Sequence, residues 1–224
     1  MNVAVIIPVY NEEQALPHVL REIPRALVHE ILVVDNGSTD DTFRVAQAAQ
    51  VKVLFEPRRG YGQACQSGLR HVSPEADVVV FLDGDHSDYP EDLPALLAPL
   101  ERNEADVVIG SRVLGGAQPG SLTPQQRFGN RLACQLIALR FHRRFTDLGP
   151  FRAIRRASLP ALGLRDLAFG WNVEMQLKAL KAGLRIVEVP VRYRPRIGRS
   201  KISGTVLGTL RAGLSILGMI ARHW

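Results

Sequence analysis

The stretch from residue 78 to residue 85 constrains this chain more than any other. Residues 78–82 are an apolar run rich in β-branched side chains, which predicts a strand buried on both faces of a sheet. Asp83, Gly84 and Asp85 follow directly. Because strand residues alternate faces, the two carboxylates can point the same way, and the glycine lets the backbone come close to a ligand. Two like charges this close are costly unless a cation such as Mg²⁺ or Mn²⁺ binds with substrate phosphates. An isolated Asp-x-Asp is more often only the polar start of a loop after a strand. Whether this one binds a cation therefore has to be judged from the flanking sequence.

Four further apolar runs, at residues 3–9, 31–34, 51–55 and 106–110, alternate with segments of helical pattern. This alternation predicts an α/β fold with a mainly parallel central sheet and helices on both faces. Ligands bind such sheets at the carboxyl ends of the strands. Polar clusters follow all five strands: Tyr10-Asn11-Glu12, Asp35, Arg58-Arg59-Gly60, Asp83-Gly84-Asp85 and Ser111-Arg112. Neither G-x-G-x-x-G nor G-x-x-x-x-G-K-[ST] is present, which argues against a dinucleotide enzyme and a P-loop ATPase.

The second half of the chain is basic. Between residues 127 and 165 the only acid is Asp147, and from residue 191 onward there is none. Helices are expected at 124–141 and 171–182, and a strand at 185–189. Apolar residues then recur every three or four positions, which predicts an amphipathic helix over 205–224. They are Leu207, Leu210, Leu214, Leu217 and Ala221. Such a helix lies in a membrane interface, packs on its own domain or contacts a partner copy, and the stripe alone does not decide.

Charge and composition narrow the function classes. The formal net charge is +6 and the pI is about 9.8, which favours an anionic partner: a nucleotide, a nucleic acid or a membrane surface. No basic strand interleaved with aromatic residues and no nucleic-acid-binding motif is present, so nucleic acid is not expected. Cys65 and Cys134 lie far apart, and the sequence has no secretory leader and no run of about 20 apolar residues. We therefore expect a cytoplasmic protein with reduced thiols and no transmembrane helix.

Taken together, the motifs resemble a known family. The chain resembles the GT-A-fold family-2 glycosyltransferases in five motifs: Pro8-Val9-Tyr10-Asn11-Glu12-Glu13, Asp35-Asn36-Gly37-Ser38-Thr39-Asp40, Arg59-Gly60-x-Gly62-x-Ala64, Asp83-Gly84-Asp85 and Gly110-Ser111-Arg112. It resembles their polyprenyl-phosphate branch, the dolichyl-phosphate mannose and glucose synthases, in Phe151-Arg152-Ala153, Glu174 and Arg199-Ser200-Lys201. The resemblance covers nearly the whole chain. It implies a GT-A domain over 1–204, with a nucleotide-sugar-binding half at 1–112 and an acceptor-binding half at 113–204, before the helix at 205–224.

The resemblance also implies roles for individual residues. Donor binding is expected from Pro8, Tyr10, Asn11, Glu12, Asp35, Gly37, Ser38, Arg59, Gly60 and Gly84, and from a mobile loop with Arg199, Ser200 and Lys201. Catalytic roles are expected for Asp83, Asp85, Arg112 and Arg127, and acceptor contacts for Asn130, Arg131, Asp147, Arg152 and Glu174. Asp85 and Asp83 would hold Mg²⁺ or Mn²⁺. The synthases usually carry Gln where this chain has Ser87, so Asp88 is the candidate third metal ligand.

The reaction implied is attack of a polyprenyl or dolichyl phosphate oxygen on the anomeric carbon of a nucleotide-activated hexose, with inversion. A phosphate monoester has its second pKa near about 6, so this acceptor needs no strong general base, and arginines suit its recognition. UDP-glucose and GDP-mannose both remain open as donors. One alternative is a small soluble acceptor, with Glu174 or Asp147 as base. A nucleotidyltransferase would need a basic glycine-rich loop after the first strand, which is absent. The lipid acceptor would place the protein at the cytoplasmic face of a membrane, with the last helix contacting the bilayer or a partner.

Overall fold

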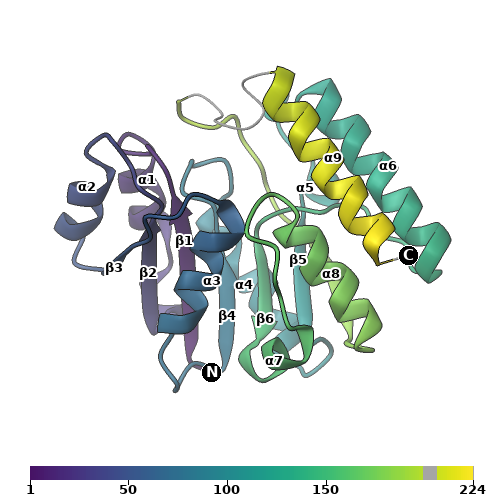
Figure 1. Cartoon of the computed structure of the whole chain (residues 1–224). Helices are drawn as coiled ribbons and strands as arrows, with labels where there is room; N and C mark the ends of the chain where they lie inside the picture. Colours follow the sequence, from purple (N-terminus) through teal and green to yellow (C-terminus); the bar gives the residue numbers. More distant parts are fainter. Residues whose placement is uncertain (199–205, 224) are drawn as a thin grey trace.

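The computed structural model describes residues 1–198 and 206–223. Within these residues, seven strands form one sheet in the order β3-β2-β1-β4-β6-β5-β7 (Figure 1). The strands are β1 Val3–Val9, β2 Glu30–Asp35, β3 Lys52–Phe55, β4 Val78–Phe81, β5 Val107–Ser111, β6 Arg152–Arg155 and β7 Ile186–Pro190. β6 runs antiparallel to β4 and β5, and the other pairs are parallel. The prediction of a mainly parallel sheet is confirmed.

Helices cover both faces of this sheet, as predicted. Alternate residues of β1 point to opposite faces, so Val5 and Ile7 pack in one apolar cluster and Ile6 packs in another. The first cluster is covered by α1 Leu16–Glu22, α2 Thr42–Ala48 and α4 Leu93–Glu101. The second is covered by α3 Tyr61–His71, α6 Pro124–Phe141, α8 Trp171–Lys181 and α9 Val206–Arg222. Shorter turns are α5 Arg112–Gly115, α7 Leu159–Leu162 and the 3₁₀ turns η1 Arg25–Leu27, η2 Pro90–Asp92 and η3 Arg156–Ser158.

The register of the central strands brings the polar clusters to one edge. Val9 at the end of β1 lies opposite Asp35 at the end of β2, and Ile6 lies opposite Phe81 at the end of β4. These strands are parallel and lie in the middle of the sheet, with β1 and β4 buried at every residue and β2 buried from Ile31 onward. The loops that follow them therefore emerge side by side, which positions a site at this edge.

Local sequence explains where several elements begin and end. Helix α1 spans only Leu16–Glu22, and it ends there because Ile23, the residue before Pro24, is extended. Helix α6 has the predicted bounds, and a capping box between Thr123 and Gln126 fixes its start. Strand β6 was not expected from the sequence: it has only four residues, and its first, Arg152, is an arginine that the fold buries completely.

Helix α9 packs beside α6 and α8, on the outer side of the second helical layer (Figure 1). Met219 and Ile220 are buried in that contact, whereas Leu214 is 69% exposed and Leu217 is 38% exposed. Part of the predicted apolar stripe therefore faces solvent, although the helix itself is packed on the domain. Among the described helices, none has the length and apolar character needed to cross a bilayer.

Candidate active site

Two cavities meet at the end of β4. The first has a volume of about 430 Å³ and lies over the carboxyl ends of β1 and β2. The second has a volume of about 510 Å³ and extends toward α6, α8 and α9. Five residues line both: Tyr61, Asp83, Asp85, Phe169 and Arg196. The two aspartates predicted to be catalytic thus lie at the junction, where a group could pass from a ligand in one cavity to a ligand in the other.

The carboxylates at the junction have different surroundings. The hydroxyl of Tyr61 donates to Asp83 Oδ1 over 3.0 Å. Burial, and then the charge of Asp85, raises the pKa of Asp83 to about 7. Asp85 Oδ1 accepts from the backbone N–H of Ser87 at 2.9 Å and from its hydroxyl, and Asp85 Oδ2 lies 3.1 Å from Nη1 of Arg196. The repulsion that raises the pKa of Asp83 is the repulsion that a cation would relieve.

This donor set suits a hard divalent cation, because carboxylate oxygens are its preferred protein ligands. Asp83 and Asp85 would hold it, and phosphate oxygens would complete its coordination. Asp88 is only 1% exposed, its carboxyl oxygens have no hydrogen-bond partner among the described residues, and burial raises its pKa well above the ordinary value. The described residues contain no cluster of three or more acidic, histidine or cysteine side chains around one point. The structure therefore does not bring Asp88 together with the other two aspartates as a third ligand.

The first cavity is walled by most of the residues expected to bind the donor. Pro8, Tyr10, Glu12, Arg59, Gly60 and Gly84 all line it. The guanidinium of Arg59 lies over the ring of Tyr10, 3.3 Å from its centroid, a cation–π contact at the cavity wall. Asn36 shapes the same wall: its amide donates to the carbonyls of Glu56 and Arg58 over 3.0 and 2.7 Å. An aromatic ring, guanidinium and carboxylate beside each other can stack on a base and hydrogen-bond a ribose.

Four predicted donor residues lie behind this wall instead. Asp35 is 1% exposed and accepts from both the backbone N–H and the hydroxyl of Ser38, at 2.9 and 2.5 Å. The N–H of Asn11 donates to the Ser38 hydroxyl over 2.9 Å. Gly37 has a φ of +74°, which the turn between these residues requires. None of the four is among the described residues that line the first cavity, so they brace the two loops that carry its walls.

The Arg59-Gly60-x-Gly62 motif connects the start of α3 to a segment about a hundred residues later in the chain, at Leu167 and Ala168. The N–H of Gly62 donates to the carbonyl of Ala168 over 3.1 Å, and the N–H of Gln63 donates to Leu167 over 3.0 Å. A Cβ on Gly62 would stand 2.2 Å from the carbonyl oxygen of Asp166, so only glycine allows this approach. The first turn of α3 is capped by these carbonyls, and the contact delivers Phe169 to the junction of the cavities.

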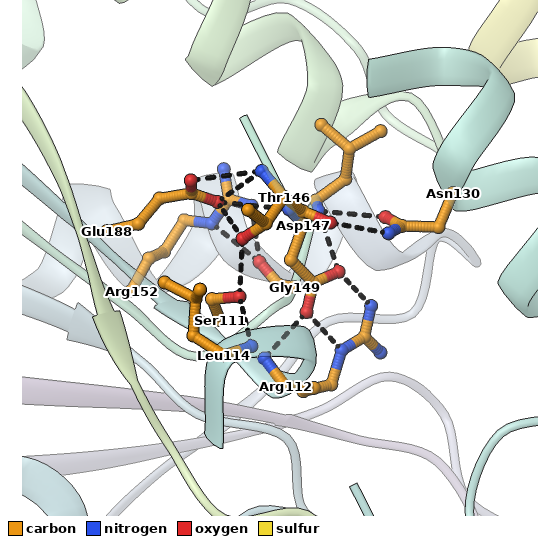
Figure 2. Close-up of polar contacts among 10 residues, drawn as sticks. Ser111, Arg112, Leu114, Asn130, Thr146, Asp147, Gly149, Arg152 and Glu188 are labelled. Carbon is orange, nitrogen blue, oxygen red and sulfur yellow. Dashed lines mark hydrogen bonds and ion pairs between the residues drawn. The ribbon is translucent and has the colours of Figure 1, made fainter. Parts of the chain in front are cut away.

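Arg112, expected to face a phosphate, is tied to Asp147 in a nearly buried pair at the second cavity (Figure 2). Its Nη2 donates to Oδ1 over 2.7 Å, and its Nε and backbone N–H both donate to Oδ2 over 2.8 Å. The side chain of Asp147 is 1% exposed and that of Arg112 is 14% exposed. Asp147 therefore orients Arg112 and keeps it charged, since the carboxylate holds the pKa of the guanidinium above its usual range.

Two further predicted acceptor residues brace the loop that carries Asp147 (Figure 2). Asn130 donates to the carbonyl of Thr146 and accepts from the N–H of Leu148, both at 3.0 Å. Arg152 is fully buried; its Nη1 donates to the carbonyl of Asn172 over 2.7 Å, and its Nε and Nη2 donate to Gly149. The expectation that Arg152 contacts an acceptor is wrong in this structure, because its donors are used inside the fold.

The remaining predicted residues lie away from the junction. Glu174 accepts from the N–H groups of Arg165 and Asp166 and pairs with Lys178 at 2.7 Å, so it anchors a loop. Arg127 and Arg131 are exposed on α6 and are not among the described residues that line the second cavity. The second cavity is instead lined toward α6 by Thr123 and Gln126. The predicted mobile loop at Arg199, Ser200 and Lys201 lies outside the described residues.

Sequence reasoning missed six residues that line the first cavity: Val9, Asn36, Tyr61, Ala64, Phe169 and Arg196. The first four stand inside motifs that the sequence displays, but only their neighbours in those motifs were predicted to bind the donor. Phe169 and Arg196 stand in irregular segments that only tertiary contacts bring to β4. The division into donor and acceptor halves stays a prediction, and these two residues from the second half also line the first cavity.

Solved structures share this architecture. Glucosyl-3-phosphoglycerate synthase from Mycobacterium tuberculosis, solved in complex with Mn²⁺, uridine diphosphate and glucosyl-3-phosphoglycerate, superposes with a TM-score of 0.77 at 24% identity. The match covers 98% of this chain and 80% of that one. This likeness identifies the GT-A fold that the sequence motifs led us to expect.

Sequence relatives identify the family. A glycosyltransferase of Mycobacterium bovis, itself uncharacterised, is 38% identical over 98% of both chains. An undecaprenyl-phosphate mannosyltransferase of Micrococcus luteus is 33% identical over 99% of this chain and 96% of its own. A dolichyl-phosphate hexose transferase of Haloferax volcanii is 33% identical over 90% of this chain and 86% of its own. The profile described as glycosyl transferase family 2 matches residues 4–163. The chain belongs to glycosyltransferase family 2 and is a GT-A glycosyltransferase that resembles the polyprenyl-phosphate transferases.

Proposed function

We propose that this enzyme moves a hexose from a nucleotide sugar of the UDP-glucose or GDP-mannose type to a polyprenyl or dolichyl phosphate, with inversion at the sugar. The observation that carries the proposal is the character of the second cavity. Arg112 and Arg196 line it near Asp83 and Asp85, whereas Leu148, Pro150 and Ile216 line it with apolar surface. A cationic end and apolar walls suit a phosphate joined to a hydrocarbon chain.

The donor would occupy the first cavity. Tyr10 and Arg59 offer a stacking wall for the base, and the junction aspartates face the diphosphate. A divalent cation, Mg²⁺ or Mn²⁺, would be held by Asp85 with Asp83 and would supply charge stabilisation to the leaving diphosphate. The Mn²⁺–uridine diphosphate complex of the structural relative is consistent with this arrangement. Arg196, at the junction, adds positive charge where the diphosphate leaves.

The acceptor phosphate is the nucleophile that needs least help from the protein. It is already largely ionised at neutral pH, so orientation by Arg112 is sufficient. A sugar hydroxyl would need a general base, and the two candidates expected from the sequence are engaged elsewhere: Asp147 pairs with Arg112, and Glu174 binds backbone amides and Lys178. This argues against the alternative of a soluble hydroxyl acceptor.

A membrane surface is the proposed location, at its cytoplasmic face. Helices α6 and α9, which lie side by side, expose Phe128, Leu139, Leu214 and Leu217. The exposed arginines of α6 include Arg127 and Arg131, and the chain from residue 124 to residue 146 contains no acid. Apolar and basic side chains together favour an anionic bilayer over a second protein copy, which is the alternative partner.

The experiment is a transfer assay with radiolabelled donor. Purified enzyme receives UDP-glucose or GDP-mannose separately, with Mn²⁺ or Mg²⁺, with and without a polyprenyl phosphate, beside Asp85→Ala. We expect cation-dependent label in the organic phase that the variant loses, and this also names the donor. Release of nucleoside diphosphate without lipid product, in the presence of a soluble acceptor, would overturn the lipid acceptor.

A further inference from the structure

Arg196 makes contacts that tie the junction of the two cavities together. It stands in the segment that follows β7, and lines both cavities. Its Nη2 lies 2.5 Å from Glu12 Oε1, and its Nη1 lies 3.1 Å from Asp85 Oδ2. The next residue, Ile197, donates its N–H to the backbone carbonyl of Asp85 over 3.1 Å. One guanidinium therefore bridges a carboxylate of the β1 loop and the carboxylate that is expected to hold the cation.

The position of Arg196 conflicts with a cation on Asp85. Asp85 Oδ1 already accepts two hydrogen bonds from Ser87, so Oδ2 is the oxygen better placed for a metal, and Oδ2 is the one that Arg196 contacts. A guanidinium and a divalent ion are like charges and repel each other at this range. Both cannot take the same carboxylate oxygen in the geometry seen here.

The hydrogen bonds of Arg196 are also incomplete. Its Nε is buried and has no partner among the described residues, although a buried donor without an acceptor is costly. A guanidinium is suited to phosphate, which accepts from two of its nitrogens at once. The side chain thus has a reason to leave Asp85 once an anion with several oxygens reaches the junction.

We propose that Arg196 is an exchangeable counter-ion of Asp85: it neutralises the carboxylate in the nucleotide-free enzyme, yields it to the divalent cation, and then donates to the diphosphate of the bound nucleotide. The same residue would serve as a place-holder before loading and as a phosphate ligand afterwards. This inference rests on the cation site of the proposed function and is independent of the lipid acceptor.

The first test measures Mn²⁺ binding by nucleotide-free protein, from the electron paramagnetic resonance signal of free Mn²⁺. Arg196→Gln should bind Mn²⁺ about threefold to tenfold more tightly than wild type, because the competing charge is gone. Arg192→Gln is the matched control: it removes the same charge nearby, but Arg192 is half-exposed and pairs with Asp92. Adding Asp85→Asn to the Arg196 variant should abolish the gain, which assigns the cation to this carboxylate.

The second test measures uridine and guanosine diphosphate binding at saturating Mn²⁺ by calorimetry. Arg196→Gln should bind the preferred diphosphate about tenfold or more weakly, opposite in sign to its effect on Mn²⁺. Equal Mn²⁺ affinity in wild type and Arg196→Gln, with unchanged melting temperatures, would overturn the exchange and leave the proposed cation site standing. Absence of Mn²⁺ binding with or without nucleotide, in every variant, would overturn both.

Discussion

The pair between Arg112 and Asp147 predicts a large loss of stability from a single atom change. In Asp147→Asn the guanidinium stays in place, only 14% exposed, but loses its counter-charge. Breaking a buried pair on one side typically costs about 3–5 kcal/mol, because a buried charge is left uncompensated. An exposed pair offers the matched control: Arg102 donates from Nε and Nη2 to Glu104 over 2.9 Å in the same fork geometry. Glu104→Gln should change stability little, because solvent screens that pair.

The assay is urea unfolding followed by tryptophan fluorescence, to which Trp171, fully buried against Phe81, contributes. We expect Asp147→Asn to lower the unfolding free energy by about 3–5 kcal/mol with an unchanged slope, and the melting temperature by roughly 6–20 °C. Glu104→Gln should unfold at nearly the wild-type urea concentration. Similar small effects from both variants would refute the reasoning that burial makes this pair matter.

Three further predictions follow from the described contacts. Gly62→Ala should reduce both nucleotide affinity, measured by calorimetry, and the melting temperature, because the added Cβ would stand 2.2 Å from a carbonyl oxygen. Unchanged affinity and melting temperature would contradict the role of this close contact. Burial raises the pKa of Asp83 from 3.8 to about 7, so the folded state holds this proton more tightly than the unfolded chain, and stability should fall as the pH rises from about 4 to about 7. In Asp83→Asn the melting temperature should depend less on pH between about 4 and about 7. The same pH dependence in the variant and the wild type would contradict this prediction. The double variant Leu214→Ser/Leu217→Ser should float less with anionic vesicles than the wild type. Phe55→Ser is the control, because Phe55 is exposed on the edge strand β3, and it should float like the wild type. Equal losses in both variants would contradict membrane binding through α9.

The sequence predicted the parts of the fold that depend on local pattern. Strands β1, β2 and β4 are apolar runs buried on both faces, and their polar ends meet at one edge because parallel strands share a direction. Strand β6 lacks such a signal: two of its four residues are arginines, and Arg152 is tolerated inside because the carbonyls of Gly149 and Asn172 accept its hydrogen bonds. The residue types in and around the strand do not show that these carbonyls accept from Arg152, because their positions depend on how the chain folds.

The site residues show the same difference between what local sequence predicts and what depends on tertiary contacts. Tyr10, Arg59, Asp83 and Asp85 were found because they lie in the short loops that follow β1, β3 and β4. Asp35 also ends a strand, but it accepts a hydrogen bond from the backbone N–H of Ser38 and does not line the cavity. The residue types alone do not predict that turn. Arg196 stands in the irregular segment after β7, so its place depends on tertiary contacts. The residue types therefore predicted which functional groups gather at this edge of the sheet. Which of these side chains face the cavity depends on the conformation of the loops.

The most direct test of the central claim is a competition between acceptors in one tube. Enzyme, Mn²⁺ and the preferred labelled donor meet a polyprenyl phosphate and 3-phosphoglycerate at equal concentration, and the label is counted in the organic and aqueous phases. The apolar walls of the second cavity predict label in the organic phase, with loss of that label in Asp85→Ala. Label that remains in the aqueous phase on the phosphoglycerate would contradict the lipid acceptor and assign the cavity to a small soluble one.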